Sequence, residues 1–274
     1  MWLVDEVAPA LDVPLETTNH LTLLLAGNAN EWTFEGTNTW LIRGSAGRAA
    51  VVDPGPDDPA HLAAICGQLA GTGHRLDRIL LTHRHNDHAA AVPELVRKTR
   101  ATVHAWQHPL ASASLHNGQR LDFDDVQIEI LATPGHTSDG ICIALLNDRV
   151  ILTGDTVLAR VNPVIGHPDG GLADMLASLH ALRDRVDDDW TILPGHGPGI
   201  RRARTFLESR ITSRNRRIEQ VRELMDQGHH TAREITAALY DGALDTRLIP
   251  AAEMSIAAVV HYLKLSEQKG SKVP

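Results

Sequence analysis

The eight residues L-T-H-R-H-N-D-H at positions 81–88 constrain the fold and the chemistry of this chain more than any other segment. They follow the apolar run Ile79-Leu80-Leu81, which is typical of a buried strand. They precede residues 89–98, where the spacing of apolar side chains predicts a helix. Three histidines and one aspartate therefore lie at a turn between a strand and a helix.

The spacing within this turn divides the four side chains into two pairs. His83 and His85 lie two residues apart, so on an extended backbone they point the same way and can share one ion. Asp87 and His88 follow where the chain bends, and they can reach a second ion nearby. Imidazole and carboxylate groups are ligands of zinc and of other borderline first-row metals. Polar loop residues without a role are the competing interpretation, which four such side chains within six positions disfavour.

Three further side chains follow apolar runs and stand beside glycine or proline. They are His136 in T-P-G-H-T, Asp155 in L-T-G-D-T and His196 in L-P-G-H-G. With the turn at 81–88, the order H-x-H-x-D-H, then His, Asp and His, resembles the metallo-β-lactamase superfamily. The match covers all seven positions and is highly specific.

The resemblance implies that the chain binds two zinc ions. One ion is implied to have the ligands His83, His85 and His136. The other is implied to have the ligands Asp87, His88 and His196, and Asp155 is implied to bridge the two ions. Asp155 and Asp87 are also the predicted catalytic residues, because a bridging carboxylate holds the ions at their working separation and Asp87 can steer the incoming water.

Asp53 is a further candidate close to this site. It follows the predicted strand Ala49–Val52 and precedes Pro54-Gly55-Pro56. A carboxylate at such a position is often only a turn former. The resemblance implies instead that Asp53 orients a metal-bound histidine from outside the ligand shell.

Residues 157–171 leave the predicted metal site as a loop with two prolines and three glycines. A loop in this place often forms the mouth of a substrate site. Asn162 and His167 are therefore candidate substrate contacts, and surface residues without a role are the equal alternative.

Residues 1–200 alternate predicted strands and helices and then continue with strands at hairpin spacing. The predicted strands are 21–26, 38–43, 49–52, 76–81, 102–106, 119–123, 126–132, 141–146, 150–152 and 191–193, and the predicted helices are 58–69, 89–98 and 172–186. This order predicts two mixed sheets with helices on both outer faces, an α/β fold of the αββα sandwich type. The resemblance implies the same metallo-β-lactamase sandwich.

Residues 201–274 are predicted to form a small C-terminal domain of three helices. Residues 201–223 carry eight arginines against three glutamates, and their apolar spacing predicts a long helix. Thr231 with Glu234 forms a capping box that starts a second helix, and Pro250 starts a third. Docking of this tail onto the sandwich and a helix-turn-helix for nucleic acid are both open at this point.

The segment S-R-N-R-R-I-E-Q at 213–220, together with N-T-W-L-I at 38–42, resembles the β-lactamase-like protein 2 family. That family carries a small winged-helix-like tail, and its characterised members are endoribonucleases that act on single-stranded RNA. The resemblance spans most of the chain, although its motifs are less specific than the metal ligands. The sequence ends four residues after Gly270, so a full β-wing is not expected.

The 274 residues carry a net charge of −8, and the pI is near 6.0. This balance excludes an overall positive field, so nucleic acid or an anionic membrane would need a local basic patch. No stretch is expected to reach the length of a transmembrane helix, and residues 1–6 lack the features of a signal peptide. A cytoplasmic location follows as an expectation. Cys66 and Cys142 are predicted to be buried free thiols.

Three functions compete at this level. The first is a dinuclear zinc hydrolase that directs a metal-bridging hydroxide at an ester, thioester or lactone. The second is a metal-dependent endoribonuclease for single-stranded RNA, favoured by the arginine-rich helix. The third is an inactive binding protein, disfavoured because all seven ligands are present. A secreted β-lactamase and a glutathione thioesterase are weaker still. The substrate, the native metal and the oligomeric state do not follow from the sequence.

Overall fold

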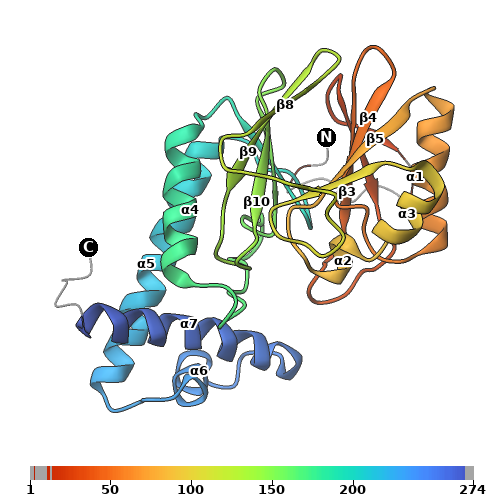
Figure 1. The fold of residues 1–274 in the computed structure, drawn as a ribbon. Helices are drawn as coiled ribbons and strands as arrows, with labels where there is room; N and C mark the ends of the chain where they lie inside the picture. Colours follow the sequence, from red (N-terminus) through yellow and green to blue (C-terminus); the bar gives the residue numbers. More distant parts are fainter. Residues whose placement is uncertain (1–2, 4–10, 13, 269–274) are drawn as a thin grey trace.

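Two β-sheets pack face to face at the centre of the fold (Figure 1). The computed structural model describes residue 3, residues 11–12 and residues 14–268. Within these residues the first sheet runs in the order β1 to β7, with strands Leu15–Glu16, Leu21–Leu25, Asn38–Arg43, Arg48–Val52, Arg75–Leu80, Thr102–Ala105 and Ala113–Ser114. The second sheet has the order β12-β11-β10-β9-β8, with β8 Arg120–Phe123, β9 Val126–Ala132, β10 Ile141–Leu145, β11 Val150–Gly154 and β12 Thr191–Pro194.

Both sheets are mixed, as the sequence predicts. Strands β1 to β4 pair antiparallel and β4 to β7 pair parallel. In the second sheet β8 to β11 pair antiparallel, whereas β11 and β12 pair parallel. Most of the functional side chains follow the carboxyl ends of β4, β5, β11 and β12, and His136 comes from the connection between β9 and β10.

Helices cover both outer faces of the sandwich (Figure 1). Helices α1 Pro59–Gly71 and α3 Val92–Thr99 pack on the first sheet, and Ile65 and Leu95 are fully buried there. Helices α4 Leu172–Arg185 and α5 Ala203–Asp226 lie against the second sheet. A third apolar cluster fills the space between the sheets. The predicted αββα sandwich is confirmed.

The C-terminal helices α6 Ala232–Tyr240 and α7 Ile249–Gln268, joined by the short 3-10 helix η1 Thr246–Leu248, pack with α5 at one end of the sandwich. Ile218, Ile235 and Ile256 belong to the same apolar cluster as Leu179 of α4 and Ile192 of β12. The boundary at residue 200 stays a prediction, and across it the helices and the second sheet share one core.

The helix that the sequence places at 89–98 begins earlier and is divided in two. Helix α2 covers Asn86–Ala89, and α3 starts at Val92 with Pro93 in its first turn. His85 has extended backbone angles and stands at the N-cap of α2. Asp87 and His88 therefore lie in a helical turn and not in a loop. The N-terminal end of a helix favours the carboxylate of Asp87.

The stretch Thr246–Gln268 has the length and composition of a membrane-spanning helix, with a mean hydropathy of 1.3, although the sequence analysis expects no such stretch. The same test is passed by core helices of folded domains. In this fold one face of α7 is buried, with Val259 and Leu263 in the cluster shared with α4 and α5. This packing buries 33% of the apolar window within Thr246–Gln268.

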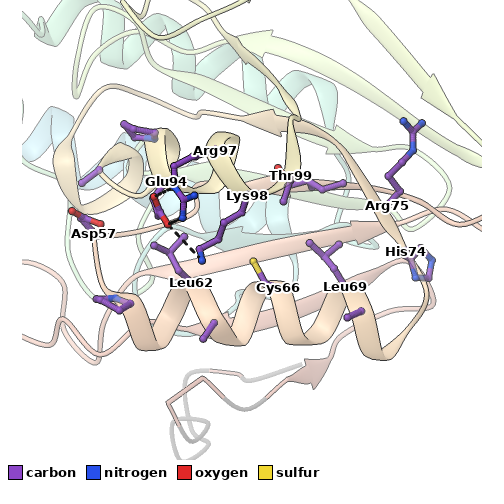
Figure 2. A pocket seen from close by; sticks show the side chains of 16 residues that line it. Asp57, Leu62, Cys66, Leu69, His74, Arg75, Glu94, Arg97, Lys98 and Thr99 are labelled. Carbon is purple, nitrogen blue, oxygen red and sulfur yellow. Dashed lines mark hydrogen bonds and ion pairs between the residues drawn. The ribbon is translucent and has the colours of Figure 1, made fainter.

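A groove of about 970 Å³ lies between α1 and α3 on the outer face of the first helical layer (Figure 2). Its cations Arg97 and Lys98 pair with Glu94 of the same helix. Cys66 lines it as a half-buried free thiol, while Cys142 is fully buried in β10. None of the predicted metal ligands lines this groove.

His20 connects the two sheets just before β2. Its ring nitrogens lie 2.8 Å from Asp148 Oδ2 and 3.4 Å from Asp125 Oδ2, in the two turns that join strands of the second sheet. Burial lowers the pKa of His20, but the hydrogen bond and charge of Asp148, and then Asp125, outweigh it and raise the pKa above its ordinary value.

We expect these ion pairs to stabilise the fold at acidic pH by less than about 1 kcal/mol. Because the folded-state pKa is raised, the contribution is complete below the unfolded pKa of about 6.5 and disappears as the pH rises through the folded value. Denaturant unfolding of the native protein and of His20→Gln at pH 5.5 and 8.5 measures it. A stability difference that grows with pH would contradict this assignment.

Candidate metal centre

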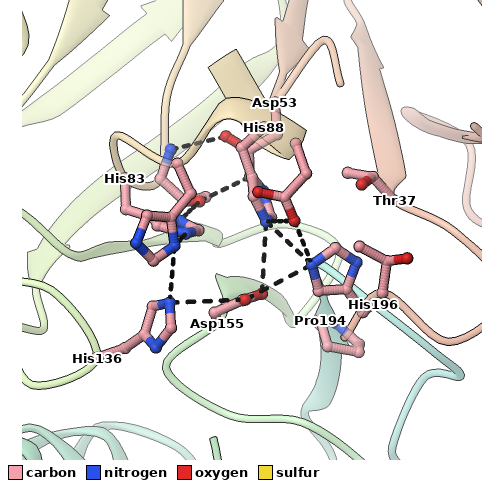
Figure 3. A network of polar contacts seen from close by, with 12 residues as sticks. Thr37, Asp53, His83, His88, His136, Asp155, Pro194 and His196 are labelled. Atoms are coloured by element: carbon pink, nitrogen blue, oxygen red, sulfur yellow. Dashed lines mark hydrogen bonds and ion pairs between the residues drawn. The ribbon is translucent and has the colours of Figure 1, made fainter. Parts of the chain in front are cut away.

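All seven predicted ligands meet at the edge where the two sheets face each other (Figure 3). They come from four places: the end of β5 with α2, the connection from β9 to β10, the end of β11 and the end of β12. In chain order they are His83, His85, Asp87, His88, His136, Asp155 and His196.

Three histidines form the first group. His85 Nδ1 lies 3.1 Å from His83 Nε2 and 3.1 Å from His136 Nε2. Imidazole nitrogens that face each other at this distance need a proton or another cation between them, since their lone pairs repel. His83 is buried, while His85 is exposed toward the cavity.

The second group joins two buried histidines and an aspartate. His88 Nε2 lies 3.2 Å from His196 Nε2, and Asp87 Oδ2 lies 3.1 Å from His196 Nε2 and 3.6 Å from His88 Nε2. Two nitrogens and one oxygen therefore converge on one point, a donor set that suits zinc or another borderline metal.

Asp155 stands between the two groups (Figure 3). Its Oδ2 lies 3.7 Å from His136 Nε2 and 3.5 Å from His196 Nε2, and its Oδ1 lies 3.6 Å from His88 Nε2. Oδ1 is buried and has no hydrogen-bond partner among the described residues. A buried carboxylate oxygen is costly without a partner, so this orphaned atom fits a cation held between the groups.

Asp53 orients His88 from behind. Asp53 is buried, and its backbone adopts a left-handed conformation with φ 51°. Its Oδ2 accepts hydrogen bonds from His88 Nδ1 at 2.9 Å and from Thr82 Oγ1 at 2.6 Å. Its Oδ1 accepts from the Thr82 amide at 2.8 Å. The bond to Nδ1 fixes the ring so that Nε2 faces the metal position, the outer role that the resemblance implies.

The rings of His136, His196 and His83 are held in the same way by groups that were not predicted from the sequence. His136 Nδ1 donates to the carbonyl of Val164 at 2.6 Å, and His196 Nδ1 donates to the carbonyl of Gly36 at 3.2 Å. Thr82 Oγ1 donates to Asp53 and accepts from His83 Nδ1 at 3.0 Å. A backbone carbonyl has no residue-type signature, so only Thr82 offered a signal.

Two glycines in the ligand motifs leave room that no other residue would leave. A Cβ on Gly154, which has φ +47°, would lie 2.4 Å from Thr82 Oγ1. A Cβ on Gly195 would lie 2.6 Å from His88 Cε1 and 2.8 Å from Asp155 Oδ1. The glycines that precede Asp155 and His196 are therefore required by the close approach of the ligands.

The charges of the centre favour a cation. Burial lowers the pKa of the His88 imidazole, yet Asp53, Asp155 and Asp87 outweigh burial and raise this pKa to about 10. Burial raises the pKa of Asp87, but His196 and His88 hold it well below its usual range. Burial, and then the neighbouring imidazoles, lower the pKa of His83. A metal ion can replace the proton that the three carboxylates attract.

The centre opens into a cavity of about 950 Å³, which the sandwich and the C-terminal helices line together. Asn162 lines the cavity, and its amide donates to Ser213 Oγ of α5 at 2.9 Å. His167 does not line it; its ring faces His261 of α7 with 5.1 Å between the centroids. Asn162 thus keeps its place as a candidate contact. The prediction for His167 lacks geometric support, because the chain turns away after Gly166.

Comparison with known proteins decides the family. The profile of the metallo-β-lactamase superfamily matches residues 32–113 and 103–196, which include every ligand described above. The chain belongs to the metallo-β-lactamase superfamily. Its fold is that of this superfamily, as the seven-ligand pattern indicates.

Among curated members of the superfamily, the lactamase-like protein adaB of Aspergillus niger is 27% identical over 217 residues, and the match covers 78% of this chain and 66% of that protein. The beta-lactamase-like protein 2 homolog of Caenorhabditis elegans is 26% identical, covering 83% of this chain and 79% of that protein. The atrochrysone carboxyl ACP thioesterase of Passalora fulva is 26% identical, and the match covers 86% of this chain and 73% of that protein. Against adaB, the chain thus spans slightly less than two thirds of the relative's length.

Solved structures agree with the fold. A beta-lactamase domain protein from Burkholderia ambifaria superposes with a TM-score of 0.83 at 20% identity, covering 97% of this chain and 92% of that chain. A second structure, TTHA1623, was solved in a di-iron-bound form and has a TM-score of 0.55 at 24% identity, covering 69% and 97%. The first match extends through the C-terminal helices.

Proposed function

We propose that this protein is a dinuclear zinc hydrolase of acyl substrates and that thioesters are its preferred class. The observation that carries the proposal is the seven-ligand cluster at the floor of a large cavity with apolar and polar walls. The thioesterase name among the relatives supports an acyl substrate. Three overlapping groups of possible ligands occur in the cluster, and the dinuclear count rests on the two that share no residue, with Asp155 joining His83 and His88 in the third.

The first ion would take His83, His85 and His136, and the second would take Asp87, His88 and His196, with Asp155 touching both. When bound, such ions lower the pKa of a coordinated water toward neutrality and polarise a carbonyl oxygen. Residues of the chain orient the imidazole ligands. Asp53, Val164 and Gly36 hold the imidazoles in the tautomer that presents the correct nitrogen.

Asp87 is the carboxylate best placed to act on the attacking water. Its side chain is 32% exposed, so it borders the cavity, and its depressed pKa keeps it ionised at neutral pH. An ionised carboxylate accepts a hydrogen bond from water and aims its oxygen at the carbonyl carbon. We assign Asp87 this orienting role beside its role as a ligand.

The apolar walls of the cavity suit the acyl body of a substrate. Leu158 and Val161 contribute from the loop after Asp155, and Leu248 and Met254 contribute from η1 and α7. Burial of an acyl chain against these side chains gains about 0.8 kcal/mol for each methylene group. Polar groups at the floor and apolar groups on the walls place the ester carbon above the metal ligands.

Hydrolysis of four substrates by the zinc-loaded protein tests the proposal: S-propyl pentanethioate, phenyl pentanoate, δ-valerolactone and labelled single-stranded RNA. We expect the highest kcat/KM for the thioester. His136→Ala should remove this activity, whereas His180→Ala, which changes an exposed histidine on α4, should retain it. Loss of activity in His136→Ala, purified in the same way as an active His180→Ala, excludes a contaminating hydrolase.

Cleavage of RNA without any acyl hydrolysis would overturn the proposal in favour of the endoribonuclease, the alternative that Arg216 and Arg217 on the cavity wall keep open. Iron-loaded protein should be measured in parallel, because TTHA1623 has a di-iron-bound form. Activity with iron and none with zinc would reject zinc while keeping the acyl hydrolase.

A further inference from the structure

Arg214 is a buried cation in the wall of the cavity. It lies in the middle of α5, its exposed fraction is 8%, and it lines the same cavity as the metal ligands. Its neighbours on that face of the helix, Ile211 and Ile218, are core residues. The Arg214 guanidinium is therefore buried, whereas the arginine-rich sequence of α5 suggests a solvent-exposed helix surface.

No carboxylate pairs with Arg214 among the residues that the structure describes. Its single hydrogen bond runs from Nη2 to the carbonyl of Pro163 at 2.6 Å. Its Nε is buried without a partner, and Nη1 has none among the described residues. Burial, and then the charge of Arg210, lower the pKa of Arg214 to about 10, which leaves the group charged at neutral pH. Buried charges are normally paired, so this one lacks its counter-ion.

The same wall holds two more cations. Arg216 and Arg217 line the cavity, neither forms an ion pair within the described part of the chain, and Arg217 lies over the ring of Tyr240 at 5.2 Å. Glu31 is the one acid among the lining residues besides the ligands Asp87 and Asp155. In a chain with a net charge of −8, this side of the cavity is locally positive.

If Arg214 had a purely structural role, it would resemble Arg210, which lies one turn earlier on α5. Arg210 also donates from Nη2 to a carbonyl of the loop after Asp155, that of Ala159 at 3.0 Å. Arg210 does not line the cavity. Holding the loop therefore does not require a side chain that borders the cavity, and Arg210 provides a matched control.

We infer that Arg214, supported by Arg216 and Arg217, binds an anionic group of the substrate, a carboxylate or a phosphate monoester. This rests on the proposed acyl hydrolysis and narrows it to amphipathic substrates that carry an anion beside an apolar acyl body. The planar guanidinium suits both groups through paired N–H donors. The anion supplies the counter-ion that the fold lacks.

Four thioesters test whether Arg214 binds an anion on the acyl side or on the thiol side of the substrate. One is S-propyl pentanethioate, which is neutral, and one is the mono-S-propyl thioester of adipic acid, with a carboxylate on the acyl side. The other two are pentanoyl thioesters of 3-mercaptopropionic acid and of 2-mercaptoethyl phosphate, with the anion on the thiol side. We expect zinc-loaded protein to prefer one anionic substrate over the neutral one by about 10- to 100-fold in kcat/KM, through KM.

In Arg214→Met this preference should fall to within about threefold of unity, Arg214→Lys should retain part of it, and Arg210→Met should retain all of it. Calorimetry with ketone analogues, in which a methylene replaces the sulfur, gives the same comparison without turnover. Thermal unfolding of each variant checks the fold.

An equal loss for neutral and anionic substrates in Arg214→Met would make the residue a holder of the loop and overturn the inference. So would the absence of any anion preference in the native protein. Salt-dependent binding of single-stranded RNA that is lost in Arg214→Met, without preference among the small anions, would identify a polymeric phosphate instead. If the native protein hydrolyses no thioester while the calorimetric preference holds, the proposed reaction fails and the anion site stands.

Discussion

Replacing Asp155 by alanine should lower kcat/KM for the thioester by about 10³-fold or more. The carboxylate touches both three-ligand groups, and its loss removes the charge that holds two cations in proximity. Metal-assisted stabilisation of the transition state contributes several kcal/mol, and each 1.4 kcal/mol is a tenfold change in rate. Steady-state kinetics and the metal content of the same preparation measure the effect together.

His167→Ala is the control, because His167 lies in the loop after the metal site and does not line the cavity. We expect its kcat/KM to stay within about threefold of the native value, as for surface changes in general. The fold of Asp155→Ala should persist, since the residue stands at the end of β11 and outside the apolar clusters. Comparable losses in the two variants would show that the role of Asp155 is wrong.

Removing the metal should abolish hydrolysis and lower the thermal stability. Without cations, the centre contains five histidines and two aspartates whose donor atoms face one another at 3.1 to 3.7 Å. A ligand present at a thousandfold excess over its Kd stabilises the folded state by about 4 kcal/mol, so Tm should fall by about 8 °C or more after chelation. Calorimetric scans before and after dialysis against a chelator measure the change.

Re-addition of zinc should restore both the hydrolysis rate and the Tm. Elemental analysis of the restored protein should then approach two equivalents of zinc for each chain. A protein saturated with zinc that holds one equivalent would exclude the dinuclear centre, although one ion could still serve the first group of three histidines. Hydrolysis that survives complete removal of metal would exclude the metal centre as the site of reaction.

The metal centre was predictable because each of its motifs is short and local. An apolar run marks a strand, and a histidine or aspartate directly after it leaves from the strand end. His83, Asp155 and His196 carry this signal independently of one another. That these strand ends meet at one site was implied by the resemblance to the metallo-β-lactamase superfamily, because the order of strands and helices alone does not say which strand ends lie together.

The cavity was not predictable to the same degree. Its walls join the loop after Asp155 with three C-terminal helices, and no local motif indicates that this loop and these helices border one cavity. Apolar spacing did contain one unused signal: Arg214 stands three residues after Ile211 and four before Ile218, on the buried face of the helix. A run of arginines conceals such a position, because charged residues are usually expected at the surface.

The shared core of the C-terminal helices and the second sheet couples recognition to folding. The sandwich alone provides the seven predicted ligands, while α5, η1 and α7 provide much of the cavity wall. Any ligand that fills the cavity touches both parts. Binding of the ligand therefore stabilises the association of the helices with the sandwich. By thermodynamic linkage, that association strengthens ligand binding by the same free energy. Specificity in this protein can accordingly change by repacking three helices, with every atom of the catalytic centre left in place.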